Sequence, residues 1–241
     1  MSQANERQLL SVMPLHAITT LYGVQGLRDR FALETARLAD PASRARVDRA
    51  LELATRLHAG DRRQREPYVN HLFRVALRIM VHYGVWDPDV ICAALLHDAV
   101  EDHAEDLCPT GRLGAFPLLG AVYGTRVADL VAAVTNPVYA SGSDRDSHYR
   151  EHVRASLDAF PWARVIKLSD FTDNGVGVIH TTGAKAVRLA RKYAPLVPAL
   201  ADLVARADTP LSDEVKARVL AQLNSATDRF NAILAADSGG R

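Results

Sequence analysis

Residues 90–102, with the sequence VICAALLHDAVED, decide the expected fold. The stretch is apolar on nearly every side until His97, and it then carries one imidazole and three carboxylates. A helix that is apolar all round belongs in the middle of a domain. We therefore predict one helix over about 89–102, with a buried first half and an ionisable end. Asp87 before Pro88 marks the start, because aspartate caps unpaired amides and proline suits the first helical position.

Helical spacing also recurs along the rest of the chain, without strand pairs joined by turn residues. A helix ending near Gly60 precedes a charged loop, and the next helix carries His71 in its first turn and closes at Gly84. Further helices are expected over 28–38, 125–135, 148–160 and 161–172, and Gly175 and Gly177 end the last of these. Prolines divide the helical stretch 184–206, and Ser212 or Asp213 can cap a final helix. These patterns predict an all-α multi-helix bundle with an N-terminal extension over 1–46, a main domain over 47–206 and a C-terminal helix over 207–241.

The composition excludes several classes of function. The 241 residues are 48% hydrophobic and 24% charged, which is typical of a globular chain, and the net charge of +1 gives no bulk field for nucleic acid or anionic membrane. Apolar runs such as 90–96 fall short of the roughly 20 residues that a membrane span needs, and the N-terminus is a poor secretory signal. We expect a cytoplasmic protein without a nucleic-acid polymer or membrane partner, and the oligomeric state stays open.

The ionisable end of residues 90–102 is the strongest candidate for chemistry. Four residues carry the charges, His97, Asp98, Glu101 and Asp102, and on a helix the pairs 97/101, 98/101 and 98/102 are three or four residues apart. They therefore share one patch, where like charges repel unless a cation compensates them. One interpretation is a divalent cation bound by His97 and Asp98, with Glu101 or Asp102 orienting or deprotonating water. The alternative is a core histidine beside a solvated helix end. Mixed imidazole and carboxylate ligands favour Mn²⁺, Fe²⁺ or Zn²⁺ over Mg²⁺ or Ca²⁺.

Further ligands would have to come from elsewhere in the chain, and His71 and Asp170 are the best candidates. Each also has a plain alternative, because His71 could cap its helix and Asp170 could lie at the surface beside a basic residue. The cationic loop 62–65 precedes His71 closely, and arginine forks match phosphate oxygens, although a solvated loop would carry the same residues. A metal, carboxylates and arginines together would describe a hydrolase of phosphate esters or anhydrides.

At these residues the chain resembles the HD-domain phosphohydrolases, and within them the hydrolase domain of RelA/SpoT-type enzymes and the small stand-alone alarmone hydrolases. The matching segments are, in order, Glu66-Pro67-Tyr68 to His71 with Val75-Ala76, Ala93 to Asp98 with Glu101-Asp102, Tyr123-Gly124 with Val127 to Thr135, and Arg164 to Asp170 with Asn174. The resemblance implies an HD-domain helical bundle and removal of pyrophosphate from the 3′ position of ppGpp and pppGpp.

The resemblance also implies roles for individual residues. One Mn²⁺ would be held by His71, His97, Asp98 and Asp170, while Glu101 and Asp102 would activate the attacking water. Arg62, Arg63 and Lys167 would hold phosphates, and Asn174 would contact the nucleotide. The alignment within the arginine loop can slip by one residue, so Arg62, Arg63 and Arg65 stay open as the phosphate contact. Lys167 could instead be a structural ion-pair partner.

Several residues depart from the family pattern, at positions that the resemblance places beside the nucleotide. These are Gln64 and Arg65 before the Glu-Pro-Tyr segment, Leu72 after the first metal histidine, and Phe171 and Asp173 after the last metal aspartate. They leave open a second reading, a phosphatase acting on NADPH or a nucleoside monophosphate. A third reading is a nucleotide-binding module without turnover.

Overall fold

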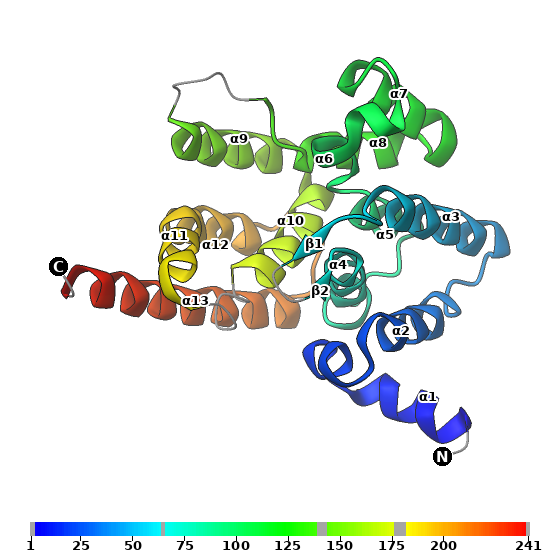
Figure 1. The fold of residues 1–241 in the computed structure, drawn as a ribbon, viewed down its shortest axis with the longest axis horizontal. Helices are drawn as coiled ribbons and strands as arrows, with labels where there is room; N and C mark the ends of the chain where they lie inside the picture. Colours follow the sequence, from blue (N-terminus) through cyan, green and yellow to red (C-terminus); the bar gives the residue numbers. More distant parts are fainter. Residues whose placement is uncertain (1–2, 64–65, 139–143, 176–181, 240–241) are drawn as a thin grey trace. The chain divides into compact units, whose positions relative to one another are not determined.

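The computed structural model describes residues 3–63, 66–138, 144–175 and 182–239. The chain divides into two compact units, Met1–Thr135 and Asn136–Arg241, and α-helices form nearly all of the regular structure (Figure 1). The predicted all-α class is therefore confirmed. The predicted domain boundaries at 46 and 206 stay predictions.

The first unit is a bundle in which α4 and α5 occupy the interior. Helix α4 (Val69–Val81) packs on α2 and α5, and α5 (Pro88–Leu95) also packs on α3 and α8. Every residue of 90–95 has 0% exposed surface, which confirms the central position expected for this stretch. The surrounding elements are α1 (Gln3–Val12), α2 (Leu15–Thr35), α3 (Pro41–Leu57), β1 (Arg62–Arg63), β2 (Glu66–Pro67), α6 (Ala99–Leu107), α7 (Arg112–Tyr123) and α8 (Thr125–Val134).

The predicted start of the central helix is confirmed. The Asp87 carboxylate accepts hydrogen bonds from the amides of Asp89 at 2.9 Å and Val90 at 3.4 Å, and Pro88 is the first helical residue. The preceding turn passes through Gly84 with a φ of 71°, a conformation that residues with a Cβ rarely adopt. The sequence thus marks both the end of α4 and the start of α5.

The prediction of one continuous helix over 89–102 is wrong, because the helix is interrupted between Leu95 and Ala99. In an unbroken helix the Ala94 carbonyl would accept the amide proton of Asp98. Here Nδ1 of His97 lies 2.8 Å from that carbonyl and takes its place, while the Ala99 amide bonds back to Leu96 at 3.0 Å. The break turns His97 and Asp98 away from the positions that one continuous helix would give them.

The charged loop before His71 contains a short strand pair that the sequence does not predict. Strands β1 and β2 are antiparallel, with Arg62 opposite Pro67 and Arg63 opposite Glu66, and the Tyr68 amide donates to the Asp61 carbonyl at 3.1 Å. Two residues a strand are too few to show an alternating pattern. Gln64 and Arg65, which connect the strands, lie outside the described residues.

The second unit is built from α9 (Arg145–Ala159), α10 (Pro161–Asn174), α11 (Gly183–Tyr193), the 3-10 turn η2 (Ala194–Leu196), α12 (Val197–Ala205) and the long α13 (Asp213–Gly239). Helices α11 and α12 both pack on α13, and α10 packs on α9 and α12 (Figure 1). The fully buried Arg164 of α10 binds Asp208 at 2.7 Å and Thr209 at 2.9 Å, which compensates its charge. The division near Pro195 is confirmed, whereas Gly177 lies outside the described residues.

Within the described residues, no helix is both long and apolar enough to span a membrane.

Candidate metal centre

The sequence-predicted residues His71, His97 and Asp98 converge in the interior of the first unit. Nε2 of His71 lies 3.3 Å from Nε2 of His97, and Oδ2 of Asp98 lies 2.9 Å from the His97 nitrogen and 3.8 Å from the His71 nitrogen. The two histidines are 0% and 2% exposed. We call these three residues the inner cluster.

The hydrogen bond at Nδ1 of His97 directs Nε2 of the same ring toward the inner cluster. The Ala94 carbonyl can only accept, so Nδ1 carries a proton and Nε2 is the ring nitrogen that faces Asp98 and His71. A lone pair 2.9 Å from a carboxylate oxygen is unfavourable unless a proton or a cation lies between them. Two imidazole nitrogens and one carboxylate oxygen therefore fit a divalent transition metal.

Tyr68 is a residue whose role the sequence does not reveal. Its hydroxyl donates to Oδ2 of Asp98 at 2.6 Å, and its ring stacks on His58 with 4.6 Å between ring centroids. Burial, and then the negative charge of Asp98, raise the pKa of the Tyr68 hydroxyl, so this group stays protonated and keeps donating. Tyr68 belongs to the Glu66-Pro67-Tyr68 segment that carries the family resemblance, but residues 66–68 show no periodic pattern that would predict an inward-facing ring.

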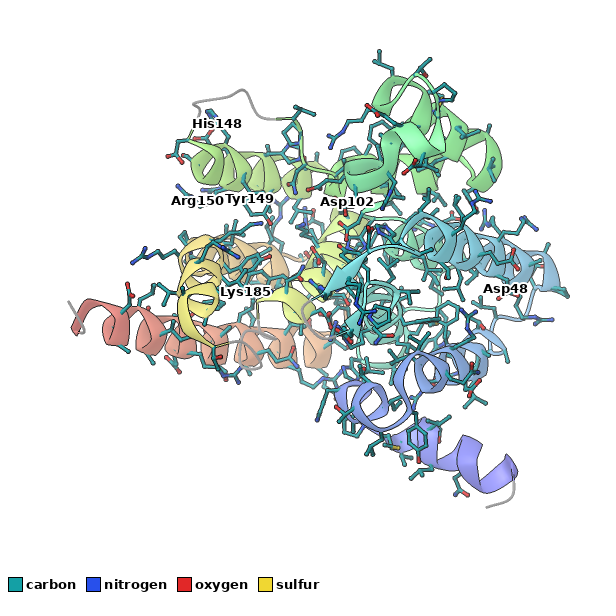
Figure 2. The ribbon with its side chains drawn as sticks, in the orientation of Figure 1. Asp48, Asp102, His148, Tyr149, Arg150 and Lys185 are labelled. Atoms are coloured by element: carbon teal, nitrogen blue, oxygen red, sulfur yellow. The ribbon has the colours of Figure 1, made fainter. Side chains whose placement is uncertain are left out.

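Glu101 and Asp102 lie in the first turn of α6, directly after the inner cluster. Partial burial of the Asp102 carboxyl, together with the charges of Asp98 and Glu101, raises its pKa to about 6. A carboxyl that titrates near neutral pH suits general acid–base chemistry. Figure 2 labels Asp102 on α6, and this residue keeps part of its surface exposed to solvent.

The two arginines of β1 differ in their surroundings. The Arg63 guanidinium lies over the Tyr68 ring at 5.6 Å from its centroid, while the Arg62 side chain is exposed. The Tyr68 hydroxyl in turn bonds to Asp98, so Arg63 is connected to the inner cluster through the Tyr68 side chain. Arg65 lies outside the described residues.

Asp170, Lys167 and Asn174 lie together on α10 in the second unit. The Lys167 ammonium lies 3.0 Å from one Asp170 oxygen, and the Asn174 amide donates to the other at 2.5 Å. Asp170 is 6% exposed, so its carboxylate faces the interior as the sequence suggested. Lys167 thus forms an ion pair, and its contact with a phosphate stays a prediction.

Two of the departures from the family pattern occupy core positions. Leu72 is 0% exposed, and Phe171 is 3% exposed and packs edge-on against Tyr193 with 5.7 Å between ring centroids. Both side chains are enclosed by other side chains of the protein, and their position beside a nucleotide stays a prediction. Asp173 is half-buried.

A second group of ligand-type residues, His58, Asp61 and His103, also lies in the first unit. No sequence motif joins these residues, and Asp61 and His103 are 42 positions apart. We call them the outer cluster.

The fold and the inner cluster agree with comparisons to known proteins. The model of the HD domain matches residues 50–202, and the chain belongs to this family. Membership of the HD domain family implies a bound divalent metal ion.

The curated relatives carry a more specific name. The chain is 30% identical over 133 residues, or 54% of its length and 68% of the relative's, to the guanosine-3′,5′-bis(diphosphate) 3′-pyrophosphohydrolase MESH1 of Drosophila melanogaster. It is 36% identical over 105 residues, or 43% of its length, to the MESH1 of Danio rerio, and 31% identical over 162 residues, or 65% of its length, to a like-named enzyme of Aquifex aeolicus. The chain spans 51% of the Danio rerio protein and only 22% of the Aquifex aeolicus protein.

A solved structure has a similar fold. It is described as a metazoan ortholog of SpoT that hydrolyzes ppGpp and plays a role in starvation responses. The TM-score is 0.59 at 25% sequence identity, and the match covers 77% of this chain and 95% of that one. This likeness supports the HD-domain bundle expected from the sequence.

Proposed function

We propose that this protein is a Mn²⁺-dependent hydrolase that removes pyrophosphate from the 3′ position of ppGpp and pppGpp. The observation that carries the proposal is the convergence of His71, His97 and Asp98 on one buried point in an HD domain. The names of the curated relatives and of the solved structure support the same substrate.

His71, His97 and Asp98 would hold the ion, and Asp170 would be the fourth ligand. When bound there, a divalent ion would lower the pKa of a water molecule and neutralise negative charge at the phosphoryl group. Asp170 has the right chemistry, because its buried carboxylate already accepts from Lys167 and Asn174, which fix its orientation. Such outer partners commonly orient metal ligands. Mn²⁺ is our choice, and Fe²⁺ or Zn²⁺ would suit the same donor atoms.

Glu101 and Asp102 would position and deprotonate the attacking water. Asp102 is our candidate for the base, because its pKa in the metal-free protein is raised to about 6, by partial burial and then by the charges of Asp98 and Glu101. Both carboxylates lie at the start of α6, one turn beyond Asp98. They follow Asp98 by three and four residues, so they lie near the proposed ligands. We assign them to the attacking water and not to the metal ion.

Arg63 would contact the phosphates of the substrate, in preference to Arg62. Its guanidinium lies over Tyr68, whose hydroxyl bonds to Asp98, whereas the Arg62 side chain is exposed. Asn174 would contact the nucleotide, and Lys167 would contact a phosphate only if its ion pair with Asp170 rearranged. The small, soluble nucleotide substrate and the absence of a membrane-spanning helix among the described residues fit a cytoplasmic location.

The test is a product analysis with protein that has been stripped of metal and reloaded with Mn²⁺. The reloaded protein is incubated with ppGpp, NADPH and simple nucleotides, and the products are resolved by ion-exchange chromatography, with His97→Ala as the inactive control. We expect GDP and pyrophosphate from ppGpp, and neither from the control.

Two other outcomes would contradict the proposal in different ways. Release of orthophosphate from NADPH or a nucleoside monophosphate, with ppGpp intact, would keep the metal centre and change the substrate. Binding of nucleotides without any product would make the protein a binding module.

A further inference from the structure

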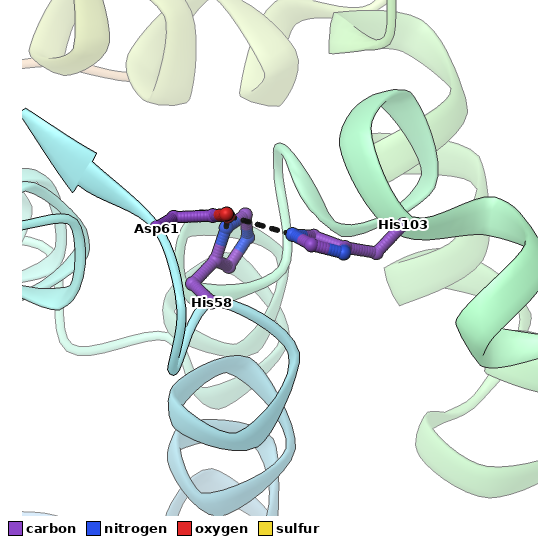
Figure 3. Close-up of side chains that lie close together, drawn as sticks. All are labelled: His58, Asp61 and His103. Atoms are coloured by element: carbon purple, nitrogen blue, oxygen red, sulfur yellow. Dashed lines mark hydrogen bonds and ion pairs between the residues drawn. The ribbon is translucent and has the colours of Figure 1, made fainter.

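The outer cluster brings three ligand atoms to one point on the first unit. Oδ2 of Asp61 lies 2.7 Å from Nδ1 of His58 and 2.7 Å from Nε2 of His103, so one carboxylate oxygen joins both imidazoles (Figure 3). His58 ends α3, Asp61 precedes β1, and His103 belongs to α6. The three residues come from separate segments and share no residue with the inner cluster.

Neighbouring groups already hold both imidazole rings in place. The His58 side chain has no exposed surface, and its ring lies between the stacked Tyr68 ring and the His103 ring, which meets it nearly at a right angle. Nδ1 of His103 lies 2.9 Å from Oδ2 of Asp106. A carboxylate on the far nitrogen of an imidazole is the usual outer partner of a metal-ligating histidine.

The backbone of α6 departs from helical geometry at His103. Its φ of −133° and ψ of 30° interrupt the helix that continues on both sides. The ring is thereby set between Asp61 and Asp106 rather than along the regular face of α6. The irregular backbone at His103 therefore determines where its side chain lies.

The two imidazole nitrogens and the carboxylate oxygen, with their partial exposure, suit a metal ion that keeps one coordination position open to water. The Asp61 side chain is 37% exposed and that of His103 is 15% exposed, so solvent reaches one side of the cluster while His58 closes the other. Zn²⁺ binds imidazole nitrogens and carboxylate oxygens at about 2.0–2.2 Å, and sites with three protein ligands leave a fourth position for water. Tetrahedral ligands at that radius stand about 3.3 Å apart, so opening the 2.7 Å contacts by roughly half an ångström would admit the ion.

We propose that His58, Asp61 and His103 form a second divalent-metal site, distinct from the inner cluster, with Zn²⁺ as the matching ion. Asp106 is the positioning residue that orients His103. An ion at this site would connect the end of α3 to α6, the helix that carries Glu101 and Asp102. The proposal does not depend on the identity of the nucleotide substrate.

The experiment measures how many Zn²⁺ ions bind to each chain. Untagged, metal-free protein is dialysed to equilibrium against buffered Zn²⁺, and the bound metal is counted by mass spectrometry after circular dichroism has confirmed the fold. His103→Gln and Asp61→Asn test the outer cluster at its more exposed members, which avoids the buried His58. His97→Ala tests the inner cluster, and His16→Gln, at an exposed histidine of α2, is the matched control.

We expect two Zn²⁺ per chain in the unaltered protein and in His16→Gln, and one in each of the other three variants. Asp106→Asn should keep the site but weaken its affinity about 10- to 100-fold, because the imidazole loses its outer partner. That graded effect separates a metal site from a cluster held only by its own hydrogen bonds.

Equal metal content in the unaltered protein, His103→Gln and Asp61→Asn would overturn the second site. A loss in those two variants, with His97→Ala still binding as many ions as the unaltered protein, would uphold the second site and contradict the inner one. The failures of the two proposals are thus distinguishable.

Discussion

The inner and outer clusters contain the same donor atoms in different surroundings. Each joins two imidazole nitrogens to one carboxylate oxygen within the first unit. The Asp98 side chain of the inner cluster is 19% exposed, whereas the Asp61 side chain of the outer cluster is 37% exposed. The outward partner of His97 is a backbone carbonyl, and that of His103 is the carboxylate of Asp106.

That difference in outward partner changes how each ring is held before metal binds. The Ala94 carbonyl accepts a hydrogen bond from Nδ1 of His97 and directs Nε2 to the inner cluster. For His103, burial lowers the pKa but the hydrogen bonds to Asp106 and Asp61 raise it by more, so the net pKa lies above its ordinary value. Because a raised pKa keeps His103 protonated up to a higher pH, a metal ion must displace that proton, and we expect the metal affinity of the outer cluster to weaken as the pH falls.

Loss of His97 should have the largest effect on activity. His97→Ala removes an inner ligand, and a bound metal contributes several kcal/mol of transition-state stabilisation, so we expect ppGpp hydrolysis to fall by about 10³-fold or more. Pyrophosphate release measures the loss, with His16→Gln as the control. Activity within tenfold of the unaltered protein would remove the inner cluster from the chemistry.

Two aspartates of α6 allow the clusters to be compared on one helix. Asp102→Asn should lower kcat by about 10²-fold or more, because it removes the proposed base. Asp106→Asn should lower kcat less, since Asp106 contacts His103 instead. Steady-state kinetics with saturating Mn²⁺ measures both, and equal losses would contradict the assignment of the base to Asp102.

Tyr68→Phe isolates the contact between the two clusters. The phenylalanine ring can still stack on His58, but the hydrogen bond to Asp98 is lost. We expect metal affinity at the inner cluster to weaken about 10- to 100-fold, with kcat at saturating metal changed much less. A Mn²⁺ titration of activity gives both values, and an unchanged midpoint would show that the hydroxyl does not orient Asp98.

The arginines of β1 form a matched pair for substrate binding. Arg63→Ala should raise KM for ppGpp about tenfold, as a lost hydrogen bond to a charged group is worth about 1.5–3 kcal/mol. Arg62→Ala should change KM less, because Arg62 is exposed and Arg63 lies over Tyr68. The reverse order in KM would move the phosphate contact to Arg62.

The smallest effect should be on stability and should depend on pH. The folded-state pKa of Asp102 is raised from 3.8 to about 6, so the native state holds this proton more tightly than the unfolded chain does. Stability of the metal-free protein therefore falls as the pH rises from about 4 to 6 and stays lower above it. Asp102→Asn lacks that loss.

We expect metal-free Asp102→Asn to be more stable than the unaltered protein at pH 8, by less than about 1 kcal/mol because the exposed side chain is screened by solvent. The difference should vanish below pH 4. Thermal melts across this range measure it, and a variant that is less stable at pH 8 would show that the charged carboxylate has a stabilising partner.

Local sequence determined the central helices and most of their ends. Asp87 and Pro88 specify the start of α5, and Gly84 specifies the turn before it, because capping and positive φ depend only on neighbouring atoms. The apolar run 90–95 specifies burial on every side. The motif around His97 also pointed to the inner cluster, whose residues His71, His97 and Asp98 the structure brings together.

Tertiary structure alone decided the break at His97 and the outer cluster. The break depends on a ring nitrogen replacing an amide at the Ala94 carbonyl, which residue spacing does not encode. Asp61 and His103 meet only because α3 and α6 pack together, although 42 positions separate the two residues. Periodicity reports which face of a helix is apolar, whereas a contact between distant polar side chains depends on how whole helices pack.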